Sequence, residues 1–356
     1  MKKNSFLKIY KNKKVLVTGS TGFKGSWLTF WLHKLGAKVV GVGLKPEKDF
    51  KLYDELKLKN KIKQYILNIE NYEKLNAVIK KEKPDIIFHL AAQSIVSSSF
   101  KFPLKTIFTN VLGSSNVLEA VRNNQVKALV FITSDKCYLN NEKKKNYKEN
   151  DRLGGFDNYS ASKASAEILF HSYFQSFFKN SKKIYVGSAR AGNVIGGGDF
   201  KKNRIIPDFF KAVAKNKVLT LRNPKSTRPW QHVLEPLSGY LKLGDLLLRK
   251  KINKKKYPSW NFGPNPINCK QVIKIISMFY DSMLLKPKIK IIKSKTLKES
   301  GLLSLNISKA KKELDWEPRL TLQESIDFTA DWYQKFYLSE NVEDFTTKQI
   351  KLYLKN

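Results

Sequence analysis

The chain has 356 residues, of which 42% are hydrophobic and 12% aromatic, so it can bury a sizeable core and is not wholly disordered. No apolar run approaches the ~20 residues of a membrane-spanning helix, and the N-terminal residues lack the apolar segment of a signal peptide. Two cysteines exclude a disulfide framework, and the histidines show no metal-ligand spacing. We therefore expect a soluble cytoplasmic protein without a metal site.

The formal net charge of +37 raises the question of nucleic-acid binding. Only 8 of the 67 basic residues are arginines, the residue that base and phosphate recognition prefers. The lysines are spread along the whole chain, and the dense runs at 143–145 and 254–256 carry no glycine-aromatic RNA motif. A general lysine bias explains this charge better, so we predict no nucleic-acid partner. A basic surface would still attract an anionic small substrate.

The first two hundred residues alternate short apolar strands with helices. We predict strands at 14–18, 38–42, 84–90, 128–133 and 183–188, and helices at 26–32, 109–123 and 159–178. Strands separated by helices of this length indicate an α/β fold with a doubly wound parallel sheet. After about residue 195, prolines and glycines divide the chain into shorter elements, which indicates a smaller C-terminal lobe over the carboxyl edge of the sheet.

A turn with three regularly spaced glycines, Gly19, Gly22 and Gly25, lies between the first strand and the first helix. Glycines there allow a tight turn and a close approach of the backbone to a pyrophosphate at the helix N-terminus. The turn therefore predicts dinucleotide binding. The second strand lacks the acid that would bind the adenosine ribose, and Lys45 follows it. Residue chemistry thus leaves NAD and NADP open.

Tyr159 and Lys163 lie four residues apart, on one face of a predicted helix. A nearby cation lowers the pKa of a phenol, so such a pair can accept a proton from a sugar hydroxyl as hydride leaves. The spacing alone is common on solvated helices and becomes informative only together with the glycine turn. Ser134, Asp135 and Lys136 follow the strand at 128–133, at the edge of the sheet where the glycine turn also lies.

These motifs resemble the extended short-chain dehydrogenase/reductase superfamily, and within it the NAD-dependent epimerase/dehydratase family. The residues Thr133-Ser134-Asp135-Lys136 are similar to those of the CDP-glucose 4,6-dehydratases, whereas the dTDP-glucose enzymes look like Thr-Asp-Glu at this position. Segments at 153–159, 189–199, 228–233 and 260–264 agree with the same family. The resemblance extends from about residue 10 to about residue 337.

The resemblance implies a lyase that converts CDP-D-glucose to CDP-4-dehydro-6-deoxy-D-glucose and water, in deoxysugar biosynthesis for surface polysaccharide such as lipopolysaccharide. NAD would be retained and regenerated in each turnover. Tyr159, assisted by Lys163, would take the 4-hydroxyl proton, and Ser134 would bind the 4-ketone. Asp135, protonated, would release the C6 hydroxyl as water. Lys136 would be the base at C5, or would instead stabilise an enolate.

The resemblance also implies binding residues. For the cofactor these are Gly19, Thr21, Gly22, Phe23, Lys24, Gly25, Asn68, Ile69, Leu90, Ala91, Ala92, Thr133, Tyr159 and Lys163. For the nucleotide sugar they are Gln93, Ser134, Asn193, Arg204 and Arg228. Asn110 resembles the asparagine that positions the catalytic lysine in related enzymes, and His89 is either structural or lines the nicotinamide side.

Three further expectations concern the whole chain. Residues 10–195 form the NAD-binding Rossmann-like domain, to which later segments return, residues 196–340 form mainly the nucleotide-sugar lobe, and residues 341–356 form a tail. A homodimer is expected, because related enzymes pair through the Tyr-Lys helix. The alternatives are a dehydratase or 4-epimerase of a dTDP-, UDP- or GDP-linked sugar and, from another class, a non-catalytic Rossmann-like nucleic-acid-binding protein.

Overall fold

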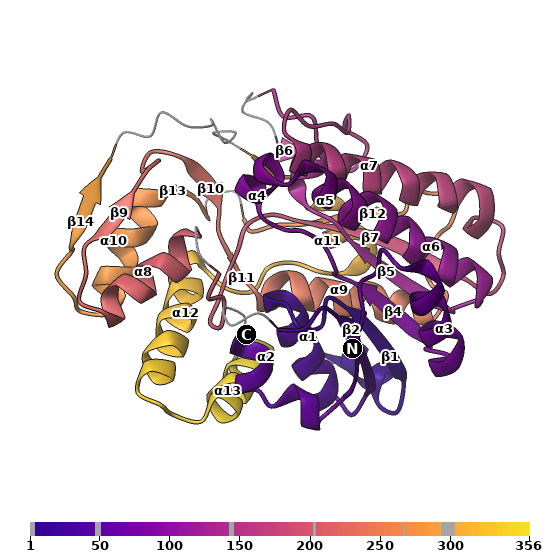
Figure 1. Cartoon of the computed structure of the whole chain (residues 1–356), viewed down its shortest axis with the longest axis horizontal. Helices are drawn as coiled ribbons and strands as arrows, with labels where there is room; N and C mark the ends of the chain where they lie inside the picture. Colours follow the sequence, from indigo (N-terminus) through magenta and orange to yellow (C-terminus); the bar gives the residue numbers. More distant parts are fainter. Residues whose placement is uncertain (1–3, 47–50, 142–145, 202–203, 266–267, 293–302) are drawn as a thin grey trace.

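A sheet of seven parallel strands lies at the centre of the computed structural model, which describes residues 4–46, 51–141, 146–201, 204–265, 268–292 and 303–356 (Figure 1). In spatial order the strands are β12 (Ser259–Phe262), β7 (Tyr185–Ala191), β5 (Ala128–Ile132), β4 (Ile86–His89), β1 (Lys14–Thr18), β2 (Lys38–Gly43) and β3 (Lys63–Ile66). The strand order reverses between the neighbours β1 and β4, and such a switch point opens a crevice at the carboxyl ends of the strands. The predicted doubly wound α/β fold is confirmed.

Helices cover both faces of the sheet because its strands are apolar on both sides. In β1, Val15 and Val17 belong to one buried cluster and Leu16 to the other, as expected for a strand whose side chains alternate. The first cluster includes residues of α1 (Phe23–Lys34) and α9 (Leu234–Leu248). The second includes residues of α3 (Tyr72–Glu82), α6 (Gly113–Asn123) and α7 (Asn158–Tyr173).

Shorter helices connect these elements. They are η1 (Ser5–Tyr10), α2 (Lys51–Glu55), η2 (Leu58–Asn60), α4 (Val96–Lys101), α5 (Pro103–Ile107), η3 (Phe108–Leu112), η4 (Asp135–Cys137) and η5 (Phe174–Phe178). Both η3 and η5 are π-helical turns, so the single helices expected at 109–123 and 159–178 are each divided into two parts.

A second lobe lies beside the carboxyl edge of the sheet, on the left in Figure 1. Its elements are α8 (Ile205–Ala214), β9 (Leu219–Leu221), β10 (Thr227–Pro229), β13 (Cys269–Gln271), α10 (Val272–Ser282), β14 (Ile289–Ile291) and α12 (Leu322–Tyr337). Two small pairings, β9 with β14 and β10 with β13, organise it. The remaining elements are β6 (Asn146–Tyr147), β8 (Val194–Ile195), β11 (Gln231–His232), β15 (Ser304–Leu305), α11 (Ser308–Leu314) and α13 (Val342–Lys355).

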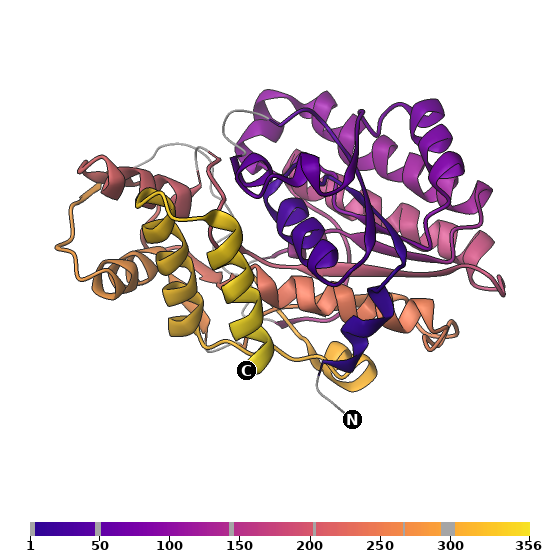
Figure 2. The same ribbon diagram turned by 90° about the horizontal axis from the view of Figure 1, so that it is seen from below.

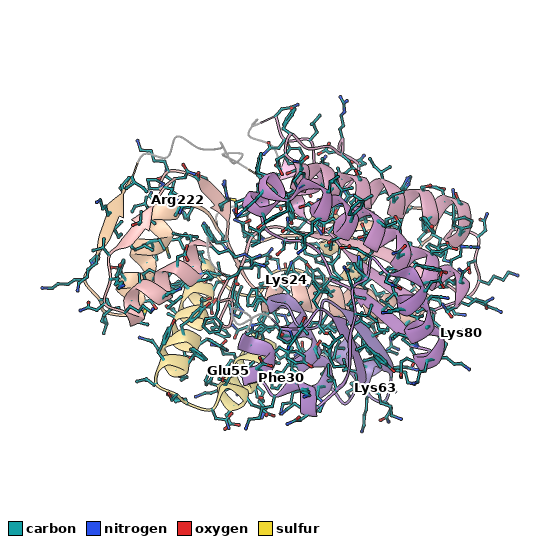
Figure 3. The ribbon with its side chains drawn as sticks, viewed as in Figure 1. Lys24, Phe30, Glu55, Lys63, Lys80 and Arg222 are labelled. Carbon is teal, nitrogen blue, oxygen red and sulfur yellow. The ribbon has the colours of Figure 1, made fainter. Side chains whose placement is uncertain are left out.

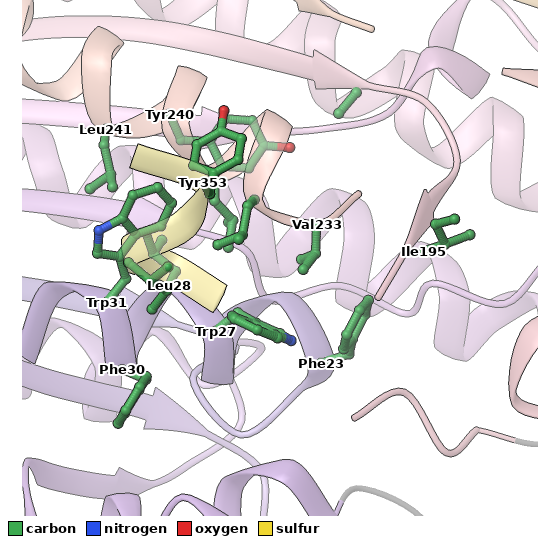
Figure 4. Packing of buried hydrophobic residues seen from close by; sticks show 14 of the residues in the cluster. Phe23, Trp27, Leu28, Phe30, Trp31, Ile195, Val233, Tyr240, Leu241 and Tyr353 are labelled. Atoms are coloured by element: carbon green, nitrogen blue, oxygen red, sulfur yellow. The ribbon is translucent and has the colours of Figure 1, made fainter. Parts of the chain in front are cut away.

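The C-terminal helix joins the main body through the core beside α1. Trp31 of α1 meets Tyr353 of α13 edge to face, with ring centroids 6.0 Å apart (Figure 4). The two chain ends lie on the same side in Figure 2, and the Asn4 side-chain amide donates to the Leu354 carbonyl at 2.7 Å. Residues 341–356, expected to form a tail, thus include a packed helix. None of the helices in the described ranges is long and apolar enough to cross a membrane.

Candidate active site

A cavity of about 1400 Å³ opens at the carboxyl edge of the sheet, between the two lobes. Every residue to which the sequence assigned a catalytic or binding role lines it. The strand topology explains this convergence, because loops that follow β1, β4 and β5 meet at one edge of a parallel sheet. The fold therefore brings all the proposed site residues together, while their individual roles remain predictions.

The glycine turn has the close packing that a phosphate cradle requires. Gly19 has φ +73°, a left-handed conformation that favours glycine, and its N–H donates to the Val42 carbonyl at 2.7 Å. A Cβ on Gly25 would lie 1.9 Å from the Gly19 carbonyl oxygen, so only glycine fits. Helix α1 begins directly after Gly22, and its first N–H groups are available for an anion. This cradle fits a dinucleotide pyrophosphate.

The adenosine side of the cavity lies beyond β2. Gly43 and Lys45 line it, and Lys45 is exposed. Thr21 donates its hydroxyl to the Leu44 carbonyl at 3.0 Å, which anchors this loop to the glycine turn. Asn68 also lines this part of the cavity, and its side-chain oxygen Oδ1 accepts a hydrogen bond from the Glu70 N–H at 3.1 Å. Because β2 ends without an acid, Lys45 and Asn68 are the polar groups here that would distinguish NAD from NADP.

The Tyr159 and Lys163 side chains are both buried at the centre of the cavity wall. Burial raises the pKa of Tyr159 to about 12, a hydrogen bond with Ser134 works against this rise, and Arg204 is the cation that lowers the pKa most. The sequence led us to expect Lys163 in that role. Burial lowers the pKa of Lys163 to about 8, and the charge of Lys24 lowers it further. Burial in the cavity wall thus disfavours both the Tyr159 phenolate and the Lys163 ammonium.

The Ser134-Asp135-Lys136 loop faces the same space as Tyr159. Ser134 caps the short helix η4 by accepting from the Lys136 N–H at 3.3 Å, and its hydroxyl donates to Asp135 Oδ1 at 2.9 Å. Burial raises the pKa of the Asp135 carboxyl, although Lys136, Ser134, Arg228 and Lys24 counteract it. A carboxyl with a raised pKa is suited to donate a proton to a leaving group.

Lys24 brings a further cation to this centre from the first turn of α1 (Figure 3). Burial lowers the pKa of its ammonium to about 8, and it interacts with the charges of Arg204 and Asp135. Its Nζ also lies 5.9 Å from the centroid of the Tyr240 ring. The site therefore places several cations around Asp135, an arrangement that suits a substrate carrying a diphosphate.

The substrate side is lined by Gln93, Asn193, Arg204 and Arg228. Arg204 pairs with Asp199 at 2.8 Å and donates to the Ser94 hydroxyl at 3.0 Å, so it connects the second lobe to the loop after β4. Both polar atoms of the Gln93 side chain bind other groups of the protein. Nε2 donates to Thr106 Oγ1 at 2.9 Å, and Oε1 accepts from the Ile95 N–H at 2.5 Å. The arginines are thus the stronger candidates for the diphosphate.

Three further residues near the site lie in surroundings that indicate structural roles. His89 lies between the hydroxyls of Thr18 (2.8 Å) and Ser114 (3.0 Å), and burial lowers its pKa to about 3, which fits a structural role. Asn110 donates to the Ser162 hydroxyl at 2.9 Å, directly before Lys163. Burial raises the pKa of the Cys137 thiol, so it stays protonated.

The sequence interpretation missed other residues near the site. Arg222 lines the cavity from the second lobe (Figure 3), but no motif surrounds it in the sequence. Glu167 and Arg190 form a completely buried ion pair that contacts Thr133 and Tyr138, on either side of the Ser134-Asp135-Lys136 loop. Two signals could have revealed this pair: Glu167 continues the four-residue spacing of Tyr159 and Lys163, and Arg190 is a charged residue within an apolar strand.

Comparisons with known proteins agree with this geometry. The sequence model of a family described as GDP-mannose 4,6 dehydratase matches residues 16–329. The chain is 40% identical to a CDP-glucose 4,6-dehydratase of Salmonella typhimurium, over 97% of each chain. Among solved structures it is similar to the epimerase Mth375 of Methanothermobacter thermautotrophicus, with a TM-score of 0.79 and 25% identity over 94% of this chain and 96% of that one. A dTDP-glucose 4,6-dehydratase of Bacillus anthracis in complex with NAD has a TM-score of 0.75 and 24% identity, over 91% and 97% of the two chains.

Proposed function

The chain belongs to the GDP-mannose 4,6 dehydratase family, and from this premise we propose that it converts CDP-D-glucose to CDP-4-dehydro-6-deoxy-D-glucose and water. The observation that carries the proposal is that Ser134, Asp135 and Lys136 line the same cavity as Tyr159 and Lys163. The name of the Salmonella relative, which matches almost the full length, supports CDP-glucose as the substrate.

We assign the cofactor site to the glycine turn and the loops beside it. The cradle formed by Gly19, Gly22 and Gly25 would hold the pyrophosphate of NAD, and Lys163 would hold the ribose next to the nicotinamide. NAD⁺ bound there would supply a hydride acceptor for C4 and, once reduced, a hydride donor for C6. In the domain division that we propose, residues 10–195 hold this cofactor and residues 196–340 hold most of the nucleotide sugar.

Oxidation at C4 begins with Tyr159, which takes the proton of the 4-hydroxyl. A phenol whose pKa is raised to about 12 is a weak acid, so the phenolate that accepts this proton has to be stabilised before the transfer. Lys163, one helical turn away, supplies the positive charge, and Ser134 binds the oxygen that becomes the 4-ketone.

Elimination follows because the 4-ketone acidifies the C5 proton. Lys136 removes this proton, and Asp135 gives its own proton to the departing C6 hydroxyl, which leaves as water. The raised pKa of Asp135 supports the protonated form that this step needs. The hydride returns to C6 and a proton returns to C5, so the product carries a 6-methyl group and a 4-ketone.

A panel of CDP-, dTDP-, UDP- and GDP-glucose, with and without added NAD⁺, tests the proposal. We expect CDP-glucose to give a 4-keto-6-deoxy sugar detected by mass spectrometry, with loss of one water. Turnover of another nucleotide sugar in its place would reassign the substrate. A 4-epimer formed without loss of water would replace dehydration by epimerisation.

We also propose a homodimer that pairs through α7 and the neighbouring α5–η3 segment. Large apolar side chains are exposed there: Leu104, Phe108, Leu112, Ile168 and Phe177. Large exposed apolar side chains on elements that contact each other are typical of an interface, and Phe177 extends this set into η5. The cytoplasmic location and the supply of deoxysugars to lipopolysaccharide remain predictions from the sequence.

A further inference from the structure

A buried ion pair lies directly below the proposed catalytic loop. Arg190 Nη2 of β7 donates to Glu167 Oε2 of α7 at 2.7 Å, and neither side chain has any exposure to solvent. The Ser188 hydroxyl also donates to Glu167 Oε2, at 3.0 Å. Burying two charges carries a large desolvation cost, which apolar side chains of similar size would avoid. The presence of the pair therefore calls for a reason other than stability.

The pair binds the catalytic loop at both of its ends. At the start of the loop, the Thr133 hydroxyl donates to Glu167 Oε1. At its end, Arg190 Nη1 donates to the Tyr138 hydroxyl at 2.8 Å, and this hydroxyl donates to Asn261 Oδ1 at 2.7 Å. The segment between these two anchors contains Ser134, Asp135 and Lys136. Hydrogen bonds to one ion pair thus anchor this segment at both ends.

Glu167 of this pair belongs to α7, the helix that also carries Tyr159 and Lys163. Glu167 follows Lys163 by four residues and Tyr159 by eight, so the three side chains lie along one side of α7. A displacement of Glu167 relative to Thr133 would therefore move one catalytic couple relative to the other. Both couples have to reach the same hexose ring, so their separation matters for the reaction.

We infer that Glu167 and Arg190 are positioning residues, which hold the Ser134–Lys136 loop at a fixed distance from Tyr159 and Lys163. This inference rests on the proposed dehydratase function and deepens it. Elimination depends most on it, because Asp135 and Lys136 must reach C6 and C5 of a ring that Tyr159 already holds at C4. Hydrogen-bonded buried networks give such a site one well-defined geometry.

Two matched substitutions test the inference. Tyr138→Phe and Tyr257→Phe each remove a hydroxyl that binds Arg190, at 2.8 Å and 3.1 Å respectively, but only Tyr138 belongs to the loop. In a second pair, Thr133→Val removes a loop hydroxyl that binds Glu167, and Ser188→Ala removes a β7 hydroxyl that binds it. The measurements are kcat and KM, the melting temperature, and the fraction of quenched 4-keto sugar that retains its 6-hydroxyl.

For Tyr138→Phe we expect kcat to fall on the order of 10- to 100-fold. We expect KM to change by less than about twofold, and the ketone with the 6-hydroxyl to accumulate. Tyr257→Phe should lower the melting temperature to a similar extent and leave kcat and the ketone fraction unchanged. Thr133→Val should likewise lower kcat and accumulate the ketone, whereas Ser188→Ala should lower only the melting temperature. This second pair still tests the inference if Tyr138→Phe does not fold.

Equal effects within each pair would overturn the positioning role, since they would indicate a general loss of stability. A wild-type protein that forms no 4-keto sugar from any nucleotide sugar would instead refute the proposed function. The two failures are therefore distinguishable.

Discussion

Asp135 and Tyr159 are both buried in the cavity wall, and burial raises the pKa of each. For Asp135 this favours the protonated form, which a general acid needs. For Tyr159 it opposes the phenolate, so the base depends on nearby positive charge. Burial thus favours the form that Asp135 needs and disfavours the form that Tyr159 needs, and the charge of Arg204 partly offsets the rise in the Tyr159 pKa.

At this scale Asp135→Asn separates the two halves of the reaction. The amide is isosteric but cannot donate an acidic proton to the C6 hydroxyl, so C4 oxidation should continue while elimination stalls. We expect overall turnover to fall on the order of 10²- to 10⁴-fold. Rapid quench and mass spectrometry should reveal a 4-ketone that still carries the 6-hydroxyl. Turnover at the wild-type rate would remove Asp135 from the mechanism.

His89 and His232 predict how stability depends on pH. Burial lowers the pKa of each to about 3, whereas unfolded histidine has a pKa of ~6.5. Below pH ~6.5 the unfolded chain binds protons that the folded chain does not, so stability falls as pH decreases toward 3. Each histidine should contribute a loss of about 1.4 kcal/mol per pH unit in that window.

Urea unfolding between pH 7 and pH 5 tests this dependence. His232 packs against Trp27 and Phe328, so His232→Phe removes the titration and keeps an aromatic ring in place. The variant should lose about 2 kcal/mol less than the wild type over this range. If the free energy of unfolding changed equally with pH in both proteins, the pKa of His232 in the folded chain would not be lowered.

Among the elements, the turn between β1 and α1 is the most restricted. A Cβ on Gly25 would lie 1.9 Å from the Gly19 carbonyl oxygen, whereas a Cβ on Gly22 would lie at an ordinary 3.4 Å from the same atom. Gly25→Ala should therefore destabilise the fold by about 1–3 kcal/mol or more, and Gly22→Ala should not. Chemical denaturation of the two variants measures the difference. Equal stabilities would mean that the turn can relax.

Two helices illustrate what element-level prediction misses. The sequence indicates continuous helices at 109–123 and 159–178, and the structure contains π-helical turns at η3 and η5 within these ranges. Hydrophobic periodicity cannot distinguish these turns, because one inserted residue changes the backbone hydrogen bonds without changing the composition. The turn η3 carries Asn110, whose amide reaches Ser162 beside the proposed catalytic lysine.

The whole molecule presents an apolar surface next to the catalytic helix. Leu112 and Ile168, 47% and 56% exposed, belong to elements that contact each other, so the proposed dimer would bury them together. Leu112→Glu with Ile168→Glu should give a monomer in sedimentation velocity, because two like charges would enter the interface from each partner. Leu338→Glu, at an exposed position after α12, is the matched control. A monomeric wild-type protein would contradict the proposal.

The arrangement of lobes was predictable only in part. The alternation of strands and helices up to residue 195 indicated the sheet, since apolar periodicity is a local property of the chain. It did not indicate that β12, at Ser259–Phe262, pairs with β7, because a four-residue strand has no sequence signal for its partner. The long helices α9 and α12 also follow a region that appeared irregular from its prolines and glycines.

By itself the sequence determined the glycine turn, the Tyr159–Lys163 spacing and the Ser134-Asp135-Lys136 loop, and these local patterns were sufficient to indicate the fold and the chemistry. Only the tertiary structure decided that they line one cavity, that Arg204 rather than Lys163 is the cation that lowers the pKa of Tyr159, and that a buried Glu167–Arg190 pair joins loop to helix. The physical reason is that burial and charge act through space. Their effects depend on which distant segments of the chain lie close together in the fold, and the spacing of residues along the chain does not give this information.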